Sequence, residues 1–454
     1  MASRRRLQPS RRPDSKWNLM RISQSRALLA LTLAATCAPA AVIGESVPPQ
    51  SITADRIAAL PRAQQAAWRN YLARSVRQMR ADLAFLQAEL KSAGLASALM
   101  PPNDRAARSV PLNKPAEWYG SAEARRIADI IVSFQTPAGG WSKNINLADH
   151  ARRPGESFAP DNSSTHRRAG DFDAPHDPQW NYVGTLDNDA TTTELRFLAQ
   201  VASPPDAQAY RVSFLRGLEY LLAAQFPNGG WPQVWPLQGG YHDAITFNDG
   251  AMTGALDLLQ EVAGGKDGYA FVPESVRARA GASLANGIAC ILATQIGPPG
   301  RRTVWAQQHD ALSLQPVAGR NYEPAAQCGS ESAALVLFLM RLPRPSPAVV
   351  DAVHAAVTWF RKTPIHGMAY QRGAGGRRLI PVRDAGPLWA RFYEIGTDRA
   401  VFGDRDKSLH DDVSEISAER RDGYSWYNAA PQQALERYAA WSLSHPPANA
   451  TLPR

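Results

Sequence analysis

The sequence repeats one pattern, in which a segment with helical spacing of apolar residues is followed by a long polar loop. Strand-like alternation of apolar and polar residues is almost absent. The loops are rich in Gly, Pro, Trp and Asn, and long loops in compact domains commonly line functional sites. The segments with helical spacing are 122–135, 191–200, 208–225, 249–262, 276–295, 330–340, 347–362 and 431–443. The pattern therefore predicts an all-α fold.

Two of the loops begin with the same motif, which suggests an internal repeat. Gln135 and Gln225 each end a helical segment, and each precedes a Gly-Gly-Trp tripeptide, at 139–141 and 229–231. The spacing between the copies accommodates about two helix pairs. Helical hairpins arranged in a ring would produce this repeat, and two unrelated Gly-Trp turns are the alternative.

The first 40 residues resemble a secretory signal. They contain most of the excess positive charge, followed by a mainly apolar run at 27–35 and the small residues Ala38-Pro39-Ala40. The run is too short to span a bilayer as a helix. We therefore predict a signal peptide at 1–40, with Met20 as a candidate start, and a secreted or periplasmic mature protein without stable membrane insertion. A membrane anchor, or a lipid anchor at Cys37, is the alternative.

Beyond the leader, the chain is nearly neutral, so we expect no nucleic-acid partner. Residues 41–114 are predicted to form an N-terminal helical segment and a linker that pack on the main domain, with Thr53 as a helix cap and Pro61 as a break. Residues 115–445 are predicted to form the catalytic domain, and 446–454 a disordered tail.

Only two cysteines remain after cleavage of the leader, too few for a disulfide-built scaffold. Cys290 and Cys328 either pair in the exported protein or are two small buried thiols. The sequence leaves both possibilities open.

Two clusters of Asn and Asp stand directly before helical segments. The first contains Asp187, Asn188 and Asp189, and the second contains Asn248 and Asp249. Carboxylate and amide oxygens are the ligands that calcium prefers. The clusters therefore predict a calcium site if the loops converge, and two separate helix caps are the alternative.

Other polar groups gather later in the chain. His309 could be a general base or a metal ligand, although a hydrogen-bonded structural role is more common for a lone histidine. Arg391, Arg399 and Arg405 lie near aromatic residues and near the segment 420–427. Arginine forks bind carboxylates and aromatic faces cover sugar rings, which suits an acidic polysaccharide; surface salt bridges are the alternative.

Several enzyme classes lack support in the sequence. The chain contains no Gly-rich phosphate loop, no nucleophile elbow and no Cys-x-x-Cys pair. Nucleotide hydrolysis, serine esterase chemistry and thiol redox chemistry are therefore not predicted.

Five ordered motifs together resemble the pectate lyases of polysaccharide lyase family ten. They are QTPAGGWSKN (135–144), TLDNDATTT (185–193), ITFND (245–249), WAQQHD with RNYEP (305–310 and 320–324) and GDRD (403–406). The resemblance covers about residues 51–442. It implies an (α/α)3 toroid, calcium dependence and β-elimination on de-esterified α-1,4-polygalacturonate. We expect a monomer.

The resemblance also implies roles for individual residues. Arg320 matches the arginine that acts as Brønsted base. Asp187, Asn188 and Asp249 match the site that holds calcium, and the first two also match substrate-binding positions. Lys143, Arg391 and Arg405 match further substrate-binding positions. Asp189 stands where the family pattern has a glycine, and the extra charge changes the expected ligand set.

The reaction explains why cations are needed. The C5 proton of a galacturonate is too weakly acidic to remove unless its carboxylate is neutralised, which calcium and arginines achieve. Arginine is ordinarily protonated, so Arg320 can act as base only where its neutral form is favoured. Two alternatives remain from the residues: a toroidal glycoside hydrolase using Asp187, Asp249 or Glu323, or an inactive polysaccharide-binding protein.

Overall fold

The computed structural model describes residues 42–447, apart from short gaps at 102, 104–109, 148, 176, 178–179, 203–206 and 299. The predicted signal peptide, and all but residues 446 and 447 of the predicted tail, lie outside the described residues. No helix in the described ranges has the length and apolar character needed to cross a bilayer.

The N-terminal segment forms two helices at the predicted place. Helix α1 (Ala54–Ala58) begins at Thr53, whose hydroxyl accepts a hydrogen bond from a backbone N–H of the first turn. Pro61 separates it from the long helix α2 (Arg62–Ala93). The Tyr71 hydroxyl on α2 donates to the backbone carbonyl at the end of α5, 2.9 Å away. The segment therefore packs on the rest of the chain.

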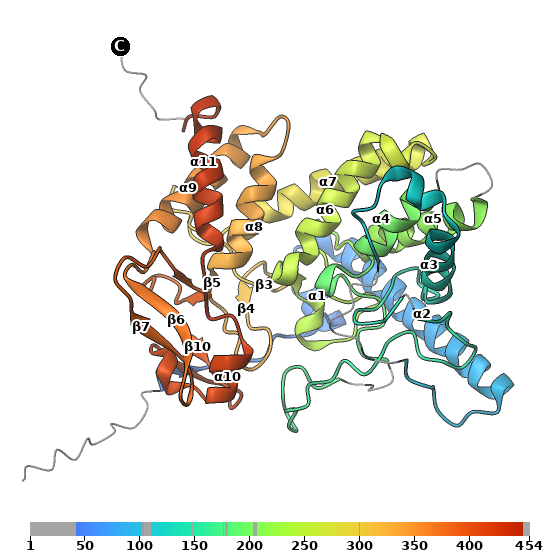
Figure 1. The fold of residues 1–454 in the computed structure, drawn as a ribbon, viewed down its shortest axis with the longest axis horizontal. Coiled ribbons are helices and arrows are strands. Elements are labelled where there is room, and N and C mark those ends of the chain that lie inside the picture. The colour runs from blue at the N-terminus through green and yellow to red at the C-terminus, as the bar shows by residue number, and fades with distance from the viewer. Residues whose placement is uncertain are drawn as a thin grey trace, which may run out of the picture. The chain divides into compact units, whose positions relative to one another are not determined.

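The remaining long helices, labelled in Figure 1, begin and end within two residues of the predicted segments. Their apolar faces are buried in a continuous core. Helix α4 packs on α5, α6 on α7, and α8 on both α9 and α11. The bounds are α3 Ala122–Ser133, α4 Thr192–Val201, α5 Gln208–Ala224, α6 Ala251–Gly264, α7 Glu274–Thr294, α8 Gly329–Met340, α9 Pro347–Lys362, α10 Ala418–Gly423 and α11 Ala430–Ser444.

The Gly-Gly-Trp motif is a structural repeat. Gln135 and Gln225 each donate to the carbonyl of the first Gly of the motif, Gly139 or Gly229, and to a backbone carbonyl of a neighbouring helix. The indole N–H of Trp141 and of Trp231 donates back to the preceding helix. The repeat anchors each loop to its helix at a fixed place.

A third copy of this arrangement is not visible in the sequence. Gln295 ends α7 and donates to the carbonyls of Thr303 and Ala352, both 3.0 Å away. The Trp305 indole donates to the carbonyl of Ile291 at 2.7 Å. The turn lacks the Gly-Gly pair that marks the other two copies, although its Gln and Trp make the same kinds of hydrogen bond.

The expectation of an all-α toroid is wrong. Besides its helices, the structure contains several small antiparallel sheets, so the fold is mixed α/β. Most strands have only two or three residues, too few to show an alternating pattern. Strands β6 (Met368–Gly373) and β7 (Gly376–Pro381) are longer, but much of their surface is exposed. Their sequences therefore do not alternate clearly between apolar and polar residues, which is the usual signal of a strand.

Except for the local β6-β7 hairpin, the sheets each join segments that are far apart in the sequence. Their orders are β1-β11-β10, β2-β3-β4, β5-β9, β12-β8 and β6-β7. The short strands are β1 Gly44–Glu45, β2 Ile245–Thr246, β3 Gln308–His309, β4 Pro316–Val317, β5 Gln327–Cys328, β8 Trp389–Ala390, β9 Phe392–Tyr393, β10 Phe402–Gly403, β11 Ser408–His410 and β12 Tyr427–Asn428. These pairings bring the polar loops together beside the helices.

The two cysteines do not form a disulfide. Cys290 and Cys328 are both free and buried. Burial raises the pKa of Cys290 to about 12, so this thiol stays protonated. The alternative of two buried thiols is therefore the correct one.

Candidate active site

A polar cavity of about 430 Å³ lies among the loops. Of the predicted site residues, Lys143, Asn188, Arg320 and Arg405 line it directly. Arg391 contacts the wall, with its guanidinium 4.6 Å from the centre of the Tyr424 ring. The structure thus brings together side chains that are up to 262 positions apart in the sequence.

Two matching turns carry the Asn and Asp clusters. The short 3₁₀ turns η3 (Asp187–Asp189) and η5 (Asn248–Gly250) contact each other, and each precedes a helix. In both turns the second and third residues have left-handed backbone angles, which cost energy for residues other than glycine. The φ angles are 54° at Asn188, 60° at Asp189, 49° at Asp249 and 73° at Gly250. Asp189 thus occupies the position that glycine fills in the second turn.

Asp187 is buried with an incomplete set of partners. Its Oδ2 atom forms an ion pair with Lys143 Nζ. The same Nζ atom lies 3.6 Å from the centre of the Tyr182 ring. Burial alone would lower the pKa of Lys143, but the charge of Asp187 raises it, so the lysine stays protonated. Asp187 Oδ1 has no hydrogen-bond partner among the described residues. A buried carboxylate oxygen of this kind requires a further cation or donor.

Asp249 lies within electrostatic reach of Asp187. Desolvation raises its pKa, and the negative charge of Asp187 raises it further. Asp249 Oδ2 accepts a hydrogen bond of 2.8 Å from the Asn248 amide. A divalent cation would stabilise the ionised form of Asp249 at such a site.

The donor set fits calcium in its chemistry but is small. Asp187, Asn188 and Asp249 offer only hard oxygen ligands, and one buried oxygen of Asp187 lacks a partner. Within the described ranges, no group of three or more His, Cys, Asp or Glu side chains is placed to hold a metal ion. Amide oxygens, water or a carboxylate from a bound ligand would have to complete the coordination.

Arg391 is held from two sides. Its Nη2 atom donates to Glu331 Oε1 and, at 3.0 Å, to Asn248 Oδ1. Glu331 opens helix α8 and also accepts from Ser330 Oγ at 2.6 Å. The arginine is only 9% exposed, so its side chain is held in place at the edge of the site. Because the Asn248 amide also donates to Asp249, Arg391 and Asp249 belong to one hydrogen-bond network.

Arg320 lines the cavity, but it is paired in this structure. Its Nη2 atom donates to Glu323 Oε1 at 2.5 Å, and its backbone N–H donates to Glu323 Oε2 at 2.7 Å. The Tyr424 hydroxyl also donates to Glu323, at 2.7 Å. Burial would raise the pKa of Glu323, but the charge of Arg320 lowers it to about 2. In turn, Glu323 outweighs the effect of burial and raises the pKa of Arg320.

This pairing has two consequences. Glu323 stays ionised, so it is unsuited to the general-acid role that a glycoside hydrolase would require. Arg320 stays protonated in the same arrangement, so a base role for it requires a change of partner when a ligand binds.

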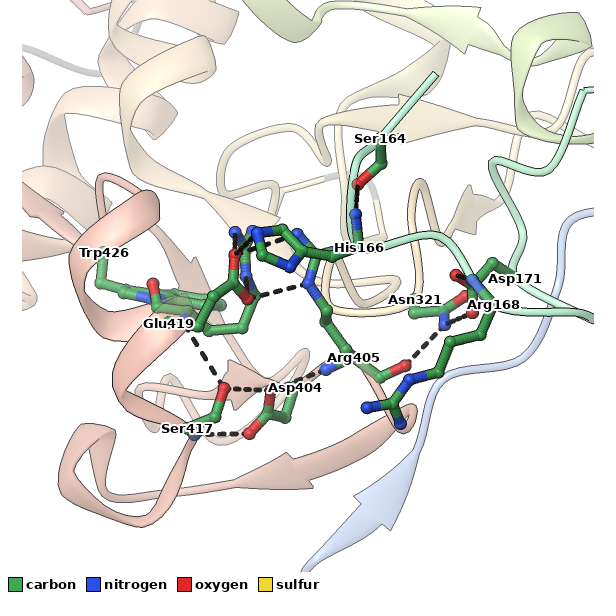
Figure 2. Close-up of polar contacts among 11 residues, drawn as sticks. Ser164, His166, Arg168, Asp171, Asn321, Asp404, Arg405, Ser417, Glu419 and Trp426 are labelled. Carbon is green, nitrogen blue, oxygen red and sulfur yellow. Dashed lines mark hydrogen bonds and ion pairs between the residues drawn. The ribbon is translucent and has the colours of Figure 1, made fainter. Parts of the chain in front are cut away.

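Arg405 is oriented by Glu419 (Figure 2). The Arg405 Nε and Nη2 atoms donate to the two oxygens of Glu419 at 2.8 and 3.1 Å. Arg420 grips the same carboxylate through its own Nε and Nη2 atoms. Both guanidiniums also lie near the Tyr322 ring, at 5.6 and 4.4 Å from its centre. One carboxylate and one ring therefore hold two cations at the cavity wall.

His309 is a structural residue. It is fully buried, its Nδ1 atom lies 2.9 Å from the Leu314 carbonyl, and its Nε2 atom accepts from the Ala306 N–H at 3.1 Å. Burial lowers its pKa to about 4. Both ring nitrogens are engaged, which confirms the structural alternative over a base or metal ligand.

Several residues of the site were missed from the sequence. The loop before α4 supplies part of the cavity wall, and Asn321 connects this loop to the site by donating to Asp171 and to the Arg405 carbonyl (Figure 2). Lone polar residues in a long loop give no periodic signal. The segment 420–427, singled out from the sequence, supplies Arg420, Gly423 and Tyr424, and the lining residues not singled out are Asn144, Asn162, Ser164, Thr165, His166, Asp173, Asn181, Tyr182, Tyr322 and Glu419.

Comparisons with known proteins agree with this arrangement. The profile of the family described as pectic acid lyase matches residues 135–435. A mutant family 10 polysaccharide lyase from Cellvibrio cellulosa, solved with trigalacturonic acid, is 31% identical, with a TM-score of 0.60 over 75% of this chain and 100% of that chain. Another structure of the family 10 polysaccharide lyase from this organism is 30% identical, with a TM-score of 0.60 over 76% of this chain and 98% of that chain. No curated protein sequence matches.

The profile spans well over half of the chain and includes both Asn/Asp turns and the arginine loops. The resemblance to polysaccharide lyase family ten is thereby confirmed. The chain is an enzyme of the pectic acid lyase family, to which the family 10 polysaccharide lyases belong.

Proposed function

We propose that this enzyme is a calcium-dependent pectate lyase that acts outside the cytoplasm on de-esterified α-1,4-polygalacturonate. The observation that carries the proposal is a cavity lined by four cations, Lys143, Arg320, Arg405 and Arg420, beside a buried carboxylate with an unpaired oxygen. A polymer with one carboxylate per sugar complements such a surface. The complex of the 31% identical lyase with trigalacturonic acid supports this choice of substrate.

Calcium would be held by Asp187, Asn188 and Asp249. When bound, it would neutralise a substrate carboxylate and so increase the acidity of the neighbouring C5 proton. Lys143 already compensates part of the charge of Asp187, which limits repulsion between this carboxylate and an acidic sugar.

The arginines supply the remaining positive charge. Arg391 and Arg405 are each fixed by a carboxylate, Glu331 or Glu419, so their guanidiniums are oriented before the substrate arrives. Fixed cations of this kind stabilise the charge that develops on the substrate carboxylate as the proton leaves. The tyrosines of the wall offer aromatic faces to the sugar rings.

Arg320 is the proposed base. It would accept the C5 proton, while the electron pair forms the C4–C5 double bond, the bond from C4 to the leaving oxygen breaks, and that oxygen takes a proton from water. The product would carry a 4,5-unsaturated sugar at its new end. Because Glu323 stabilises the charged guanidinium, the substrate must weaken this pair before Arg320 can lose a proton. Nearby cations such as Lys143 then favour the neutral form.

A single assay separates this function from hydrolysis. Purified protein is incubated with polygalacturonate, and unsaturated product is followed by ultraviolet absorbance alongside total reducing ends. We expect both signals to rise together, to vanish with chelator and to return with calcium. Reducing ends without absorbance would show hydrolysis, and full activity after thorough chelation would exclude the calcium requirement. Highly methyl-esterified pectin should react more slowly, because esterification removes the charge that the cations bind.

Export is tested separately. The exported protein should begin near Ala41, which mass spectrometry of the intact chain can determine. An uncleaved N-terminus on exported protein would refute the signal peptide without affecting the lyase assignment.

A further inference from the structure

The β6–β7 hairpin is a cationic arm beside the cavity. We propose that it binds the part of the anionic polygalacturonate chain that extends beyond the cavity; this inference rests on the proposed function. The hairpin is defined here as residues 368–383. It contains four arginines and no acidic residue: Arg372, Arg377, Arg378 and Arg383.

The arginines are arranged in a way that favours an anionic partner. Arg372 and Arg377 lie directly opposite each other across the two strands. Like charges in this position destabilise a hairpin. Asp422 offsets part of this cost, because one of its oxygens lies 3.8 Å from Arg372 and the other accepts from the Arg377 backbone N–H at 2.7 Å. The remaining positive charge is an unfavourable feature that binding to a polyanion would relieve.

Two further arginines are open to solvent. The Arg383 side chain is 96% exposed, and its nearest carboxylate, on Asp384, is 91% exposed, so this contact is weak. Arg378 lies opposite Gln371 on an exposed part of the hairpin. No hydrogen bond or ion pair to another described residue is found for Arg378. These two side chains can therefore contact a polymer without breaking a buried interaction.

Helix α10 connects the hairpin to the cavity. Two of its residues, Arg420 and Gly423, line the cavity, and the residues between them hold the hairpin. The Tyr370 hydroxyl donates to the Arg421 carbonyl at 2.8 Å, and Arg421 Nη2 donates to the Gly375 carbonyl at 2.6 Å. Only one turn of helix thus separates the cavity wall from the arm. A polymer leaving the cavity on this side would meet the arm.

The mode of binding follows from the chemistry of the arm. Exposed guanidiniums separated along a hairpin recognise repeated carboxylates through charge and paired hydrogen bonds. Such contacts should be sensitive to salt and should add affinity only for chains longer than the cavity holds. The arm is therefore a determinant of preference for long chains over short ones.

The test compares long polygalacturonate with trigalacturonate. The variant is Arg378→Gln with Arg383→Gln, and the control is Arg77→Gln with Arg80→Gln, which removes the same charge from exposed positions on α2. We expect KM on the polymer to rise by about two- to tenfold in the arm variant, since each exposed charge contact contributes a small factor. The KM of the arm variant on trigalacturonate and the KM of the control variant on both substrates should be unchanged. The difference in KM on the polymer between the arm variant and the wild type should shrink at high salt. An unchanged KM on the polymer would overturn the proposal.

A binding measurement separates this proposal from the proposed function. Retention on immobilised polygalacturonate is measured with chelator present, so that turnover does not intervene. Weaker retention of the arm variant than of the control variant would support polymer binding by the arm. This result would hold even if the wild type showed no lyase activity, and then only the proposed function would fail. Equal retention of both variants would exclude the arm as a binding surface.

Discussion

The carboxylate of Glu331 fixes the guanidinium of Arg391 at the edge of the site. Both side chains are buried, and the same guanidinium also reaches Asn248 in the second Asn/Asp turn. The pair joins the start of α8 to the loop after β8, which are distant in the sequence. It therefore couples the position of a proposed substrate-binding cation to the proposed calcium site.

Removing this carboxylate should impair both activity and stability. Glu331→Ala leaves Arg391 buried without its counter-charge, so we expect the free energy of unfolding to fall by about 3–5 kcal/mol. Glu331→Gln should fold better while lowering kcat/KM, because the amide orients the arginine less strongly. Urea unfolding and steady-state kinetics check this, with Asp257→Asn as control, since Asp257 pairs with Arg341 on the surface. If the Glu331 variants lost no more stability and activity than the Asp257→Asn control, Glu331 would not be needed to hold Arg391.

Arg320 should be essential for the chemical step. We expect Arg320→Ala and Arg320→Lys each to lower kcat by about 100-fold or more with a smaller effect on KM, as loss of a base does. The wild-type rate should rise toward alkaline pH, because more of the guanidinium becomes neutral there. Near-normal turnover of Arg320→Lys would show instead that Arg320 only binds the substrate, and would direct attention to Lys143.

Calcium affinity should depend on pH in a defined direction. The pKa of Asp249 is raised, so this group binds a proton at higher pH than an ordinary aspartate and must release it when calcium binds. Affinity should therefore fall as the pH is lowered through the raised pKa. Calorimetric titration with calcium across acidic and neutral pH measures this, and Asp249→Asn should bind more weakly with less dependence on pH. Identical affinities for the variant and the wild type would exclude Asp249 as a ligand.

Glu323 should contribute stability that is lost in acid. Its folded-state pKa is about 2, below its ordinary value of 4.5, so its stabilising effect is complete above the ordinary value and disappears as the pH falls toward the folded one. Between neutral pH and pH 3, the wild type should lose about 2 kcal/mol more than Glu323→Gln. Urea unfolding at both pH values provides the comparison. Equal losses would show that the Arg320 pair adds no net stability.

The sequence by itself determined the positions of the long helices, and it predicted four residues that line the cavity, Lys143, Asn188, Arg320 and Arg405. Helical spacing over ten or more residues is a strong signal because the buried face of a helix must be apolar along its whole length. The motifs around Asp187, Asn248 and Arg320 were found because each is contiguous. The prediction of an all-α fold failed because strands of two residues, such as those at Gln308 and Cys328, are too short to carry a pattern.

Only the tertiary structure decided which groups meet. Glu331, Glu323 and Glu419 each form an ion pair with one of the proposed functional arginines. For Glu331 and Glu419, the arginine lies far enough along the sequence that its proximity cannot be predicted from the spacing. The same holds for the hairpin arm, whose exposed polar strands resemble a loop in the sequence. Such ion pairs depend on the packing of separate loops against common helices, and that packing is a property of the folded chain as a whole.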